Sequence, residues 1–254
     1  AWKNGQLRDF LVRQAGLACG VVAVVLVALG YWRFLSPARV CVLDVGQGDA
    51  ILVADGSAAV LVDTGPDDSV VKALARQHVY HLDAVILTHF HDDHVGGLSH
   101  LLGTVGCDRV LVAEGSADDE GSELECSILE LTGGASEELS YGDAVRVGGF
   151  SLRVVSPTTE VDGADNEDSI ELALAYEEEG ASLTGLLAGD AERDETGAAL
   201  ERGDVGDVDF LKVGHHGSEV SVTSEEAAEL DPEVSVASAG EGNRYGHPSQ
   251  TCVN

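Results

Sequence analysis

Ligand-type side chains crowd into one short stretch, Thr88–Gly97, which reads THFHDDHVGG. Three histidines and two aspartates lie between His89 and His94, directly after the apolar run Ala84–Leu87. A short, continuously apolar run is typical of a strand that is buried on both faces of a sheet. Side chains at the carboxyl end of such a strand project into a crevice, where open α/β sheets place their sites. The stretch therefore favours an α/β fold with a chemical site at a sheet edge.

The spacing within this stretch offers two pairs of ligands. His89 and His91 are two residues apart, whereas Asp93 and His94 are adjacent. In an irregular turn, one pair can face one metal ion and the other pair a second. Imidazole and carboxylate groups together suit Zn²⁺, Mn²⁺ or Fe²⁺. We therefore expect one or two bound ions, with Zn²⁺ favoured and Mn²⁺ as the alternative.

Two later apolar runs end in ligand-type residues as well. Asp190 follows Leu186–Ala188, and the pair His215 and His216 follows Phe210–Val213. Each of these is weak evidence alone, because a single aspartate or histidine pair often has a purely structural role. Three strand ends that deliver ligand types together indicate one shared metal centre.

Short apolar runs separated by turn residues continue along the whole chain, in two successive sets that also contain helical patterns. This mixture predicts a layered α/β domain with two sheets inside and helices outside. Strands are expected at 40–45, 50–54, 58–63, 84–88, 110–113, 144–147, 151–155, 170–176, 183–188, 210–213 and 234–237. Helices are expected at 69–78, 95–102, 123–131, 191–201 and 224–229.

A stretch without charged residues, Ala15–Trp32, precedes the first strand. It is just long enough to cross a bilayer as a helix. We therefore expect a transmembrane segment with its flanks at residues 1–37 and one domain at 38–254. A buried core helix and a signal peptide cleaved after Ser36–Ala38 are the alternatives. Basic residues are more numerous before the stretch than after it, which favours an N-terminus inside the cell and a domain outside.

Charge is distributed unevenly. Residues 1–38 carry four basic residues and one acid, whereas the remainder carries ten basic and 44 acidic residues. Such a surface repels nucleic acid and anionic membranes at long range.

The five cysteines have no CxxC spacing and indicate no zinc–thiolate site, although Cys107 and Cys126 could pair in an exported domain. The absence of methionine and the abrupt end after HPSQTCVN suggest a fragment that lacks its C-terminal end.

Several motifs of the sequence resemble those of a known family. HFHDDH fits the H-x-H-x-D-H motif of the metallo-β-lactamase superfamily, and LLAGD, HHGS and LVDTG are similar to its other motifs. Leu43–Val53 (LDVGQGDAILV), Leu211–Ser218 (LKVGHHGS) and Asn243–Ser249 (NRYGHPS) resemble the C-terminal domain of the ComEC family of DNA-uptake channels. The resemblance covers about residues 36–250. It implies a four-layer αββα metallo-β-lactamase sandwich preceded by one transmembrane helix.

The resemblance also implies roles for individual residues. His89 and His91 would hold the first metal, Asp93 and His94 the second, and Asp190 would bridge the two. One of His215 and His216 would complete the second site, while the other would position substrate or donate a proton. Asp63, and also Asp49 in the GQGD turn, would support ligands from behind. The candidate catalytic residues are Asp93, Asp190, His215 and Lys212.

Further residues near these motifs are candidate contacts to a phosphate group, with local turn chemistry as the alternative for each: Asn166, Ser169, Ser218 and His247. Lys212 could stabilise phosphate charge or could be an interior lysine paired with an acid. Much of the superfamily has another ligand histidine between His94 and Asp190, where this chain has only His100. We expect His100 on the helix beneath the site, which leaves the first metal weakly held or present only with substrate.

These features predict a membrane-tethered, metal-dependent hydrolase of phosphodiesters, specifically a nuclease for single- or double-stranded DNA during uptake. The chain would be joined to the remainder of a polytopic channel in the cell membrane, with its hydrolase domain outside the cytoplasm. A degenerate metal-binding domain with a structural or gating role in a DNA channel is one alternative. The other is a metallo-hydrolase of a lactam, thioester or lactone.

Overall fold

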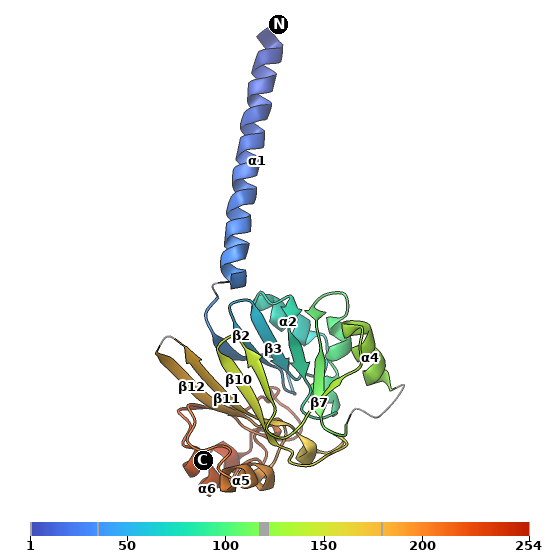
Figure 1. Cartoon of the computed structure of the whole chain (residues 1–254), viewed down its shortest axis with the longest axis vertical. Helices are drawn as coiled ribbons and strands as arrows, with labels where there is room; N and C mark the ends of the chain where they lie inside the picture. Colours follow the sequence, from blue (N-terminus) through green and yellow to red (C-terminus); the bar gives the residue numbers. More distant parts are fainter. Residues whose placement is uncertain (1, 35, 117–121, 179, 254) are drawn as a thin grey trace.

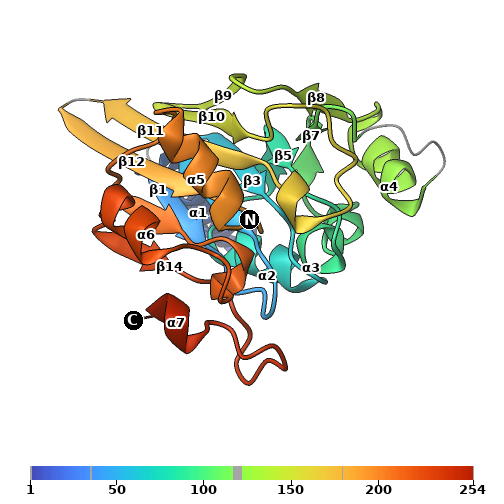
Figure 2. The ribbon, with the colours of Figure 1, turned by 90° about the horizontal axis from the view of Figure 1, so that it is seen from below.

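The computed structural model describes residues 2–34, 36–116, 122–178 and 180–253, and only the backbone at helix residues 2–7, 29 and 32–34. Two six-stranded sheets face each other, and helices cover their outer faces (Figures 1 and 2). This arrangement is the predicted αββα sandwich.

The first sheet comes from the N-terminal half of the domain and has the order β1-β2-β3-β5-β7-β8. Its first three strands are antiparallel, and each later neighbour is parallel. The tight hairpin between its second and third strands uses Gly56 at φ 54°, a conformation that glycine adopts without steric cost. The strands are β1 (Arg39–Val42), β2 (Ile51–Asp55), β3 (Ala58–Val62), β5 (Ala84–Ile86), β7 (Val110–Ala113) and β8 (Glu137–Leu139).

The second sheet comes from the C-terminal half and has the order β14-β13-β12-β11-β10-β9. The strands from β9 to β12 are antiparallel, whereas β12, β13 and β14 are parallel. These strands are β9 (Ala144–Val147), β10 (Phe150–Ser156), β11 (Glu171–Glu178), β12 (Ala181–Leu187), β13 (Phe210–Lys212) and β14 (Val234–Val236). A separate two-stranded sheet pairs β4 (His81–Leu82) with β6 (Gly106–Cys107).

Three hydrophobic interfaces hold the four layers together, because strand side chains alternate between the two faces of each sheet. On β2, Ile51 and Val53 face the second sheet, whereas Leu52 faces the helices. The outer helices of the first sheet are α2 (Ser69–Arg76), α3 (Asp92–Val95), η1 (Leu98–Leu101) and α4 (Glu123–Thr132). The second sheet is covered by α5 (Arg193–Glu201) and α6 (Ser224–Leu230), and α7 (Gln250–Val253) follows near the C-terminus.

The longest helix, α1 (Trp2–Phe34), projects away from the sandwich (Figure 1). Arg8–Ala28 has the length and mean hydropathy of a membrane span, and its most apolar part is not buried in the protein. This span begins earlier than the predicted Ala15–Trp32. Because the described side chains of α1 have no protein core around them, the alternative of a buried core helix is wrong.

Several predicted boundaries need correction. The helix expected at 95–102 is two short pieces, α3 and η1, because the chain turns at Gly96 and Gly97.

Cys107 and Cys126 are both free thiols, and Cys107 is buried whereas Cys126 is exposed. The proposed pairing of these two cysteines therefore does not form in this structure. Part of the acidic region, residues 117–121, lies outside the described residues.

Candidate metal centre

Three strand ends meet at one edge of the sandwich and deliver the ligand-type residues. His89 follows β5, and His94 lies on the short α3 after it. In the second sheet, β12 and β13 are parallel and Leu187 is paired with Lys212. Asp190 and His215 each come three residues after this pair, so both turns open at the same edge. The predicted meeting of three strand ends is present.

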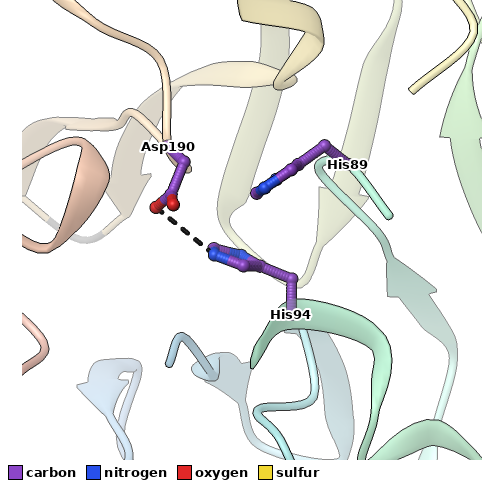
Figure 3. A group of neighbouring side chains, drawn as sticks. All are labelled: His89, His94 and Asp190. Atoms are coloured by element: carbon purple, nitrogen blue, oxygen red, sulfur yellow. Dashed lines mark ion pairs between the residues drawn. The ribbon is translucent and has the colours of Figure 1, made fainter. Parts of the chain in front are cut away.

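Two histidines approach the carboxylate of Asp190 from different sides. His94 Nε2 lies 3.3 Å from Asp190 Oδ1, and His216 Nε2 lies 3.4 Å from Asp190 Oδ2. The ring centroids of His89 and His94 are 4.2 Å apart, and both rings point toward Asp190 (Figure 3). Each oxygen of one buried carboxylate thus faces a different imidazole, as expected for a carboxylate that bridges two cations.

Ligand atoms gather within 4.8 Å of one another in overlapping groups, which include His89/His94/Asp190 and Asp93/His94/His216. His94 Nε2 and Asp190 Oδ1 are buried and face each other at 3.3 Å, yet neither makes a hydrogen bond within the described residues. Buried polar atoms without hydrogen bonds are costly. Their convergence, and the mixture of imidazole and carboxylate, fit one or two divalent ions of the Zn²⁺ or Mn²⁺ class.

Neighbouring carboxylates raise the pKa of two buried histidines in the site. Burial would lower the pKa of His94, but the carboxylates of Asp190 and Asp63 raise this pKa well above its usual value. Burial also opposes protonation of His216, yet hydrogen bonds to Asp49 and Asp93 raise its pKa to about 9. A divalent ion would replace these protons, since metal ligands must be deprotonated.

His89 differs from these two histidines. Burial, followed by the neighbouring charge of His94, lowers the pKa of His89 to about 3. The ring is therefore neutral at physiological pH and needs no deprotonation before it binds a cation. Its Nδ1 lies 3.2 Å from the hydroxyls of both Thr88 and Ser169, which orient the ring.

Asp63 supports the site from behind, in the position that the sequence predicted. Its Oδ2 lies 2.8 Å from His94 Nδ1, and it accepts hydrogen bonds from the backbone N–H and hydroxyl of Thr88.

Asp63 has φ 60°, and His215 and His216 have φ 43° and 54°. Non-glycine residues in this left-handed region store strain of about 1–3 kcal/mol each and cluster at functional sites.

Lys212 is not placed to contact a phosphate group, which corrects the prediction of a catalytic role. Its side chain is fully buried, its Nζ lies 2.7 Å from Asp49 Oδ2, and it donates to Val213 O. The alternative of an interior lysine paired with an acid is therefore the right one. Burial would raise the pKa of Asp49, but the Lys212 ammonium and His216 lower it to about 2. Asp49 also lies 3.4 Å from His216 Nδ1, behind the site.

The neighbouring residues His215 and His216 have different environments in the structure. His216 is buried and lies 3.2 Å from Asp93 Oδ2, whereas His215 is partly exposed and has Nδ1 3.0 Å from Glu192 Oε1. Only His216 belongs to a group of at least three ligand atoms within the described residues. His91 is exposed, and its Nδ1 lies 3.0 Å from His89 Nε2 without a third ligand in such a group.

The four candidate phosphate contacts fall into different environments. Asn166, on η2 (Asn166–Asp168), has its Nδ2 3.3 Å from the ring nitrogens of His215. Ser169 is buried and accepts a hydrogen bond from the backbone N–H of Asp190. Ser218 is buried against Ser221 and the backbone N–H of Val220, which is local turn chemistry and corrects its predicted contact with phosphate.

The fourth candidate, His247, lies at the rim of the site. Its ring centroid is 5.7 Å from that of His215 and 6.5 Å from that of His216. His100 is exposed on η1 (Leu98–Leu101) and contributes to no ligand group of the described residues. The histidine that was missing from the sequence pattern is therefore not replaced by His100.

Two supporting residues were not identified from the sequence. Thr88 holds Asp63 and lies beside His89, and its position directly before the histidine cluster was the available signal. Glu192 holds His215, and it follows two residues after Asp190 in GDAE. Thr88 and Glu192 each place a polar group beside a residue of a sequence motif, Asp63 and His215 respectively.

Comparisons with known proteins agree with this geometry. The family model of the metallo-beta-lactamase superfamily matches residues 43–240. ComE operon protein 3 of Bacillus subtilis is 28% identical over 94% of this chain and 33% of that protein. Competence protein ComA of Neisseria gonorrhoeae is 28% identical over 86% of this chain and 29% of that protein. The chain thus spans about a third of the length of these relatives.

A solved structure shows the same fold. The metallo-beta-lactamase fold protein YhfI from Bacillus subtilis aligns with a TM-score of 0.52, at 15% identity, over 83% of this chain and 90% of that chain. This similarity extends to the arrangement of layers only.

Proposed function

We infer that this chain, which belongs to the metallo-beta-lactamase superfamily and is related to competence proteins, is a metal-dependent hydrolase of phosphodiesters. The single observation that carries the proposal is the placement of Asp190. Its two buried oxygens face His94 and His216, and the contact with His94 joins the two sheets. Such a carboxylate suits two cations that together hold a phosphodiester.

The proposed ligands are His89, His94 and Asp190 on one side, and Asp93, His216 and Asp190 on the other. Divalent ions at these positions supply Lewis-acid activation of water and neutralise negative charge on a phosphate group. Asp63 fixes the ring orientation of His94, since a partner on the second ring nitrogen determines which nitrogen is free. Asp49, which is itself paired with Lys212, lies behind His216 in the same way, 3.4 Å from its Nδ1.

His215 is the proposed proton donor. Its Nδ1 is engaged by Glu192 Oε1 at 3.0 Å, which leaves Nε2 to give a proton to the departing oxygen. Asn166 lies beside the ring and keeps it at the rim. This pairing of a carboxylate with a histidine is a common way to set the tautomer of a catalytic imidazole.

We further propose that the substrate is DNA and that the domain at 38–254 acts at the cell membrane, outside the cytoplasm, beside the rest of a polytopic channel. The resemblance to the ComEC family and the apolar helix α1 support this setting. The acidic surface opposes DNA at long range, so recognition would depend on bound cations and on contacts close to the site.

The test is hydrolysis of labelled single- and double-stranded DNA by the full chain in detergent micelles. After removal of metal with a chelator, Zn²⁺ or Mn²⁺ is added back, and bound metal is measured in parallel. We expect cleavage only with metal, and a loss of at least about 100-fold for Asp190→Ala, because this residue joins both halves of the site. Asp207→Ala, which removes an exposed carboxylate, is the matched control.

Each other outcome identifies a different function. Bound metal without turnover of any diester would support the structural or gating role in a channel. Turnover of a lactam, thioester or lactone without turnover of DNA would assign a different substrate to the same centre. Cleavage by Asp190→Ala at the wild-type rate would remove the basis of the proposal.

A further inference from the structure

The loop after β14 carries an exposed aromatic residue beside the metal centre. Tyr245 is 54% exposed, and its ring stacks on the ring of His247 with centroids 5.8 Å apart and an angle of 10° between the planes. The guanidinium of Arg244 lies 4.9 Å from the centroid of Tyr245 and donates from Nη2 to Tyr245 Oη at 2.7 Å. These two side chains, called the platform below, bring an aromatic ring and a cationic guanidinium together on one loop.

The backbone beneath the platform is held in place by one side chain. Asn243 donates from Nδ2 to the carbonyls of Gly240 and His247, and its Oδ1 accepts from the backbone N–H groups of Tyr245 and His247. All the hydrogen-bonding capacity of this amide is thus spent on a single short loop. The loop is also joined to the first sheet, since Gly240 N donates to Gln47 Oε1 at 3.0 Å. Tyr245 is therefore presented in one orientation.

The platform begins one ring away from the proposed metal ligands. His247, on which Tyr245 stacks, has its ring centroid 6.5 Å from that of His216. His216 in turn contacts Asp93 and Asp190. A ligand on the platform would therefore lie next to whatever group occupies the metal centre.

Arg244 places a positive charge beside the site of a protein whose net charge is −31. Arg153 and Arg202 are both paired with Asp204. Arg244 makes no ion pair with a carboxylate in the described part of the chain, and it contacts a tyrosine ring instead. A guanidinium on an aromatic ring attracts groups that are both planar and negatively charged, and nucleotides combine these properties.

We propose that Tyr245 and Arg244 form a stacking platform for one base of single-stranded nucleic acid, next to the phosphodiester held at the metal centre. The inference rests on the proposed phosphodiesterase function and adds the strand state of its substrate. A paired duplex offers its stacked faces only at its ends, so the platform selects single strands or frayed ends. Stacking tolerates every base, and we expect little sequence preference.

The experiment measures binding of fluorescent single-stranded oligonucleotides to the full chain in detergent micelles, with Ca²⁺ in place of a catalytic metal. We expect Tyr245→Ala to weaken binding about tenfold, the effect typical of one lost base stack. Tyr245→Phe keeps the ring and should bind as the wild-type chain does. The matched control is Tyr141→Ala, since Tyr141 also has an arginine near its ring but bonds to Asp204.

Oligonucleotides with a single abasic position, moved along the strand, test the platform in the unmodified protein. One abasic position should weaken wild-type binding about tenfold, and it should have little further effect on Tyr245→Ala. Equal affinity of Tyr245→Ala and wild-type chains would overturn the platform, as would undetectable binding of single strands by the wild-type chain. Turnover of bis(4-nitrophenyl) phosphate, which has no base, tests the proposed phosphodiesterase function separately.

Discussion

At the scale of single residues, burial decides which charged groups take part in chemistry. Lys212 and His215 lie on the same chain segment, yet Lys212 is fully buried against Asp49 while His215 is partly exposed at the rim. A solvent-exposed charged group can meet a substrate, whereas a buried one must be paired within the protein. The motif alone could not separate these two residues, because burial depends on the folded structure.

The Lys212–Asp49 pair predicts a large effect on stability. Lys212→Met should reduce the free energy of unfolding by about 3–5 kcal/mol, because the buried carboxylate of Asp49 loses its ammonium partner. The double variant Asp49→Asn/Lys212→Met should recover much of that loss. Urea denaturation of the metal-free chain measures both.

The matched control for this pair is Lys72→Met. Lys72 makes an exposed pair with Asp68 at 2.8 Å, and a surface pair of this kind contributes about 0.2–1 kcal/mol. Equal losses for Lys212→Met and Lys72→Met would contradict the view that burial makes the first pair important.

A buried acid on β11 predicts a dependence of stability on pH. Glu171 is fully buried and accepts a hydrogen bond from Thr196 Oγ1 of α5 at 2.7 Å. Burial raises the pKa of Glu171 to about 8, above its ordinary value of 4.5. The folded chain holds this proton more tightly than the unfolded chain does. The resulting stabilisation is complete below pH 4.5 and is lost as pH rises through about 8.

Glu171→Gln should remove this component, since an amide does not titrate. The difference in unfolding midpoint between the variant and the wild-type chain should grow in favour of the variant from pH 5 to pH 9, a window set by the raised pKa. Glu177→Gln, an exposed change on the same strand, serves as the control. A difference that stays constant with pH would show that Glu171 titrates normally.

At the scale of elements, strand prediction succeeded where the apolar runs were long and continuous. The strands β7 and β9 have the predicted bounds, and the other nine predicted strands differ by a few residues at their ends. The strands β4, β6 and β8 were missed, because they are two or three residues long and β8 carries two exposed glutamates. Such strands form because a neighbouring strand is present, and local sequence contains little signal for them.

The short helix after the histidine cluster was predicted in the right place but with the wrong form. A continuous helix at 95–102 fits the apolar spacing, yet the structure turns at Gly96 and Gly97. A side chain at Gly97 would collide with the backbone carbonyl of Thr64. This close approach brings Thr64 into hydrogen bonds with His94 O through both its backbone N–H and its hydroxyl.

Gly97→Ala is therefore expected to displace α3 and reduce both stability and metal affinity. Overpacking of this kind costs about 1–3 kcal/mol. Urea denaturation and calorimetric titration with Zn²⁺ measure the two effects. Gly206→Ala is the control, since a side chain at Gly206 meets open space. Unchanged metal affinity in Gly97→Ala would show that the position of His94 does not depend on this contact.

At the scale of the whole molecule, the sequence predicted the layers but not the order of strands within them. Continuous apolar runs indicate strands with two buried faces, and this is enough to infer helices outside two sheets. Which strands are neighbours depends on contacts between residues distant in the chain. The resemblance to a known family, and not the apolar pattern, supplied the αββα order.

The membrane orientation is also a property of the whole molecule. The excess of basic residues before the span predicts that the domain lies outside the cytoplasm. Cys126 is an exposed thiol on α4, whereas Cys19 lies within the apolar span. In intact cells, a membrane-impermeant maleimide should label the wild-type chain but not Cys126→Ser. Labelling of Cys126 only after the cells are opened would place the domain on the cytoplasmic side.

The proposed ligands of the metal centre are divided between the two sheets. A bound ion would therefore stabilise the packing of one sheet against the other. The first sheet supplies His89, Asp93 and His94, and the second supplies Asp190 and His216. A cation held by both adds its binding free energy to the docking of one sheet on the other, about 2.7 kcal/mol at a hundredfold excess over its Kd. Metal supply on the side of the membrane where the domain lies would then set how long the folded sandwich survives there.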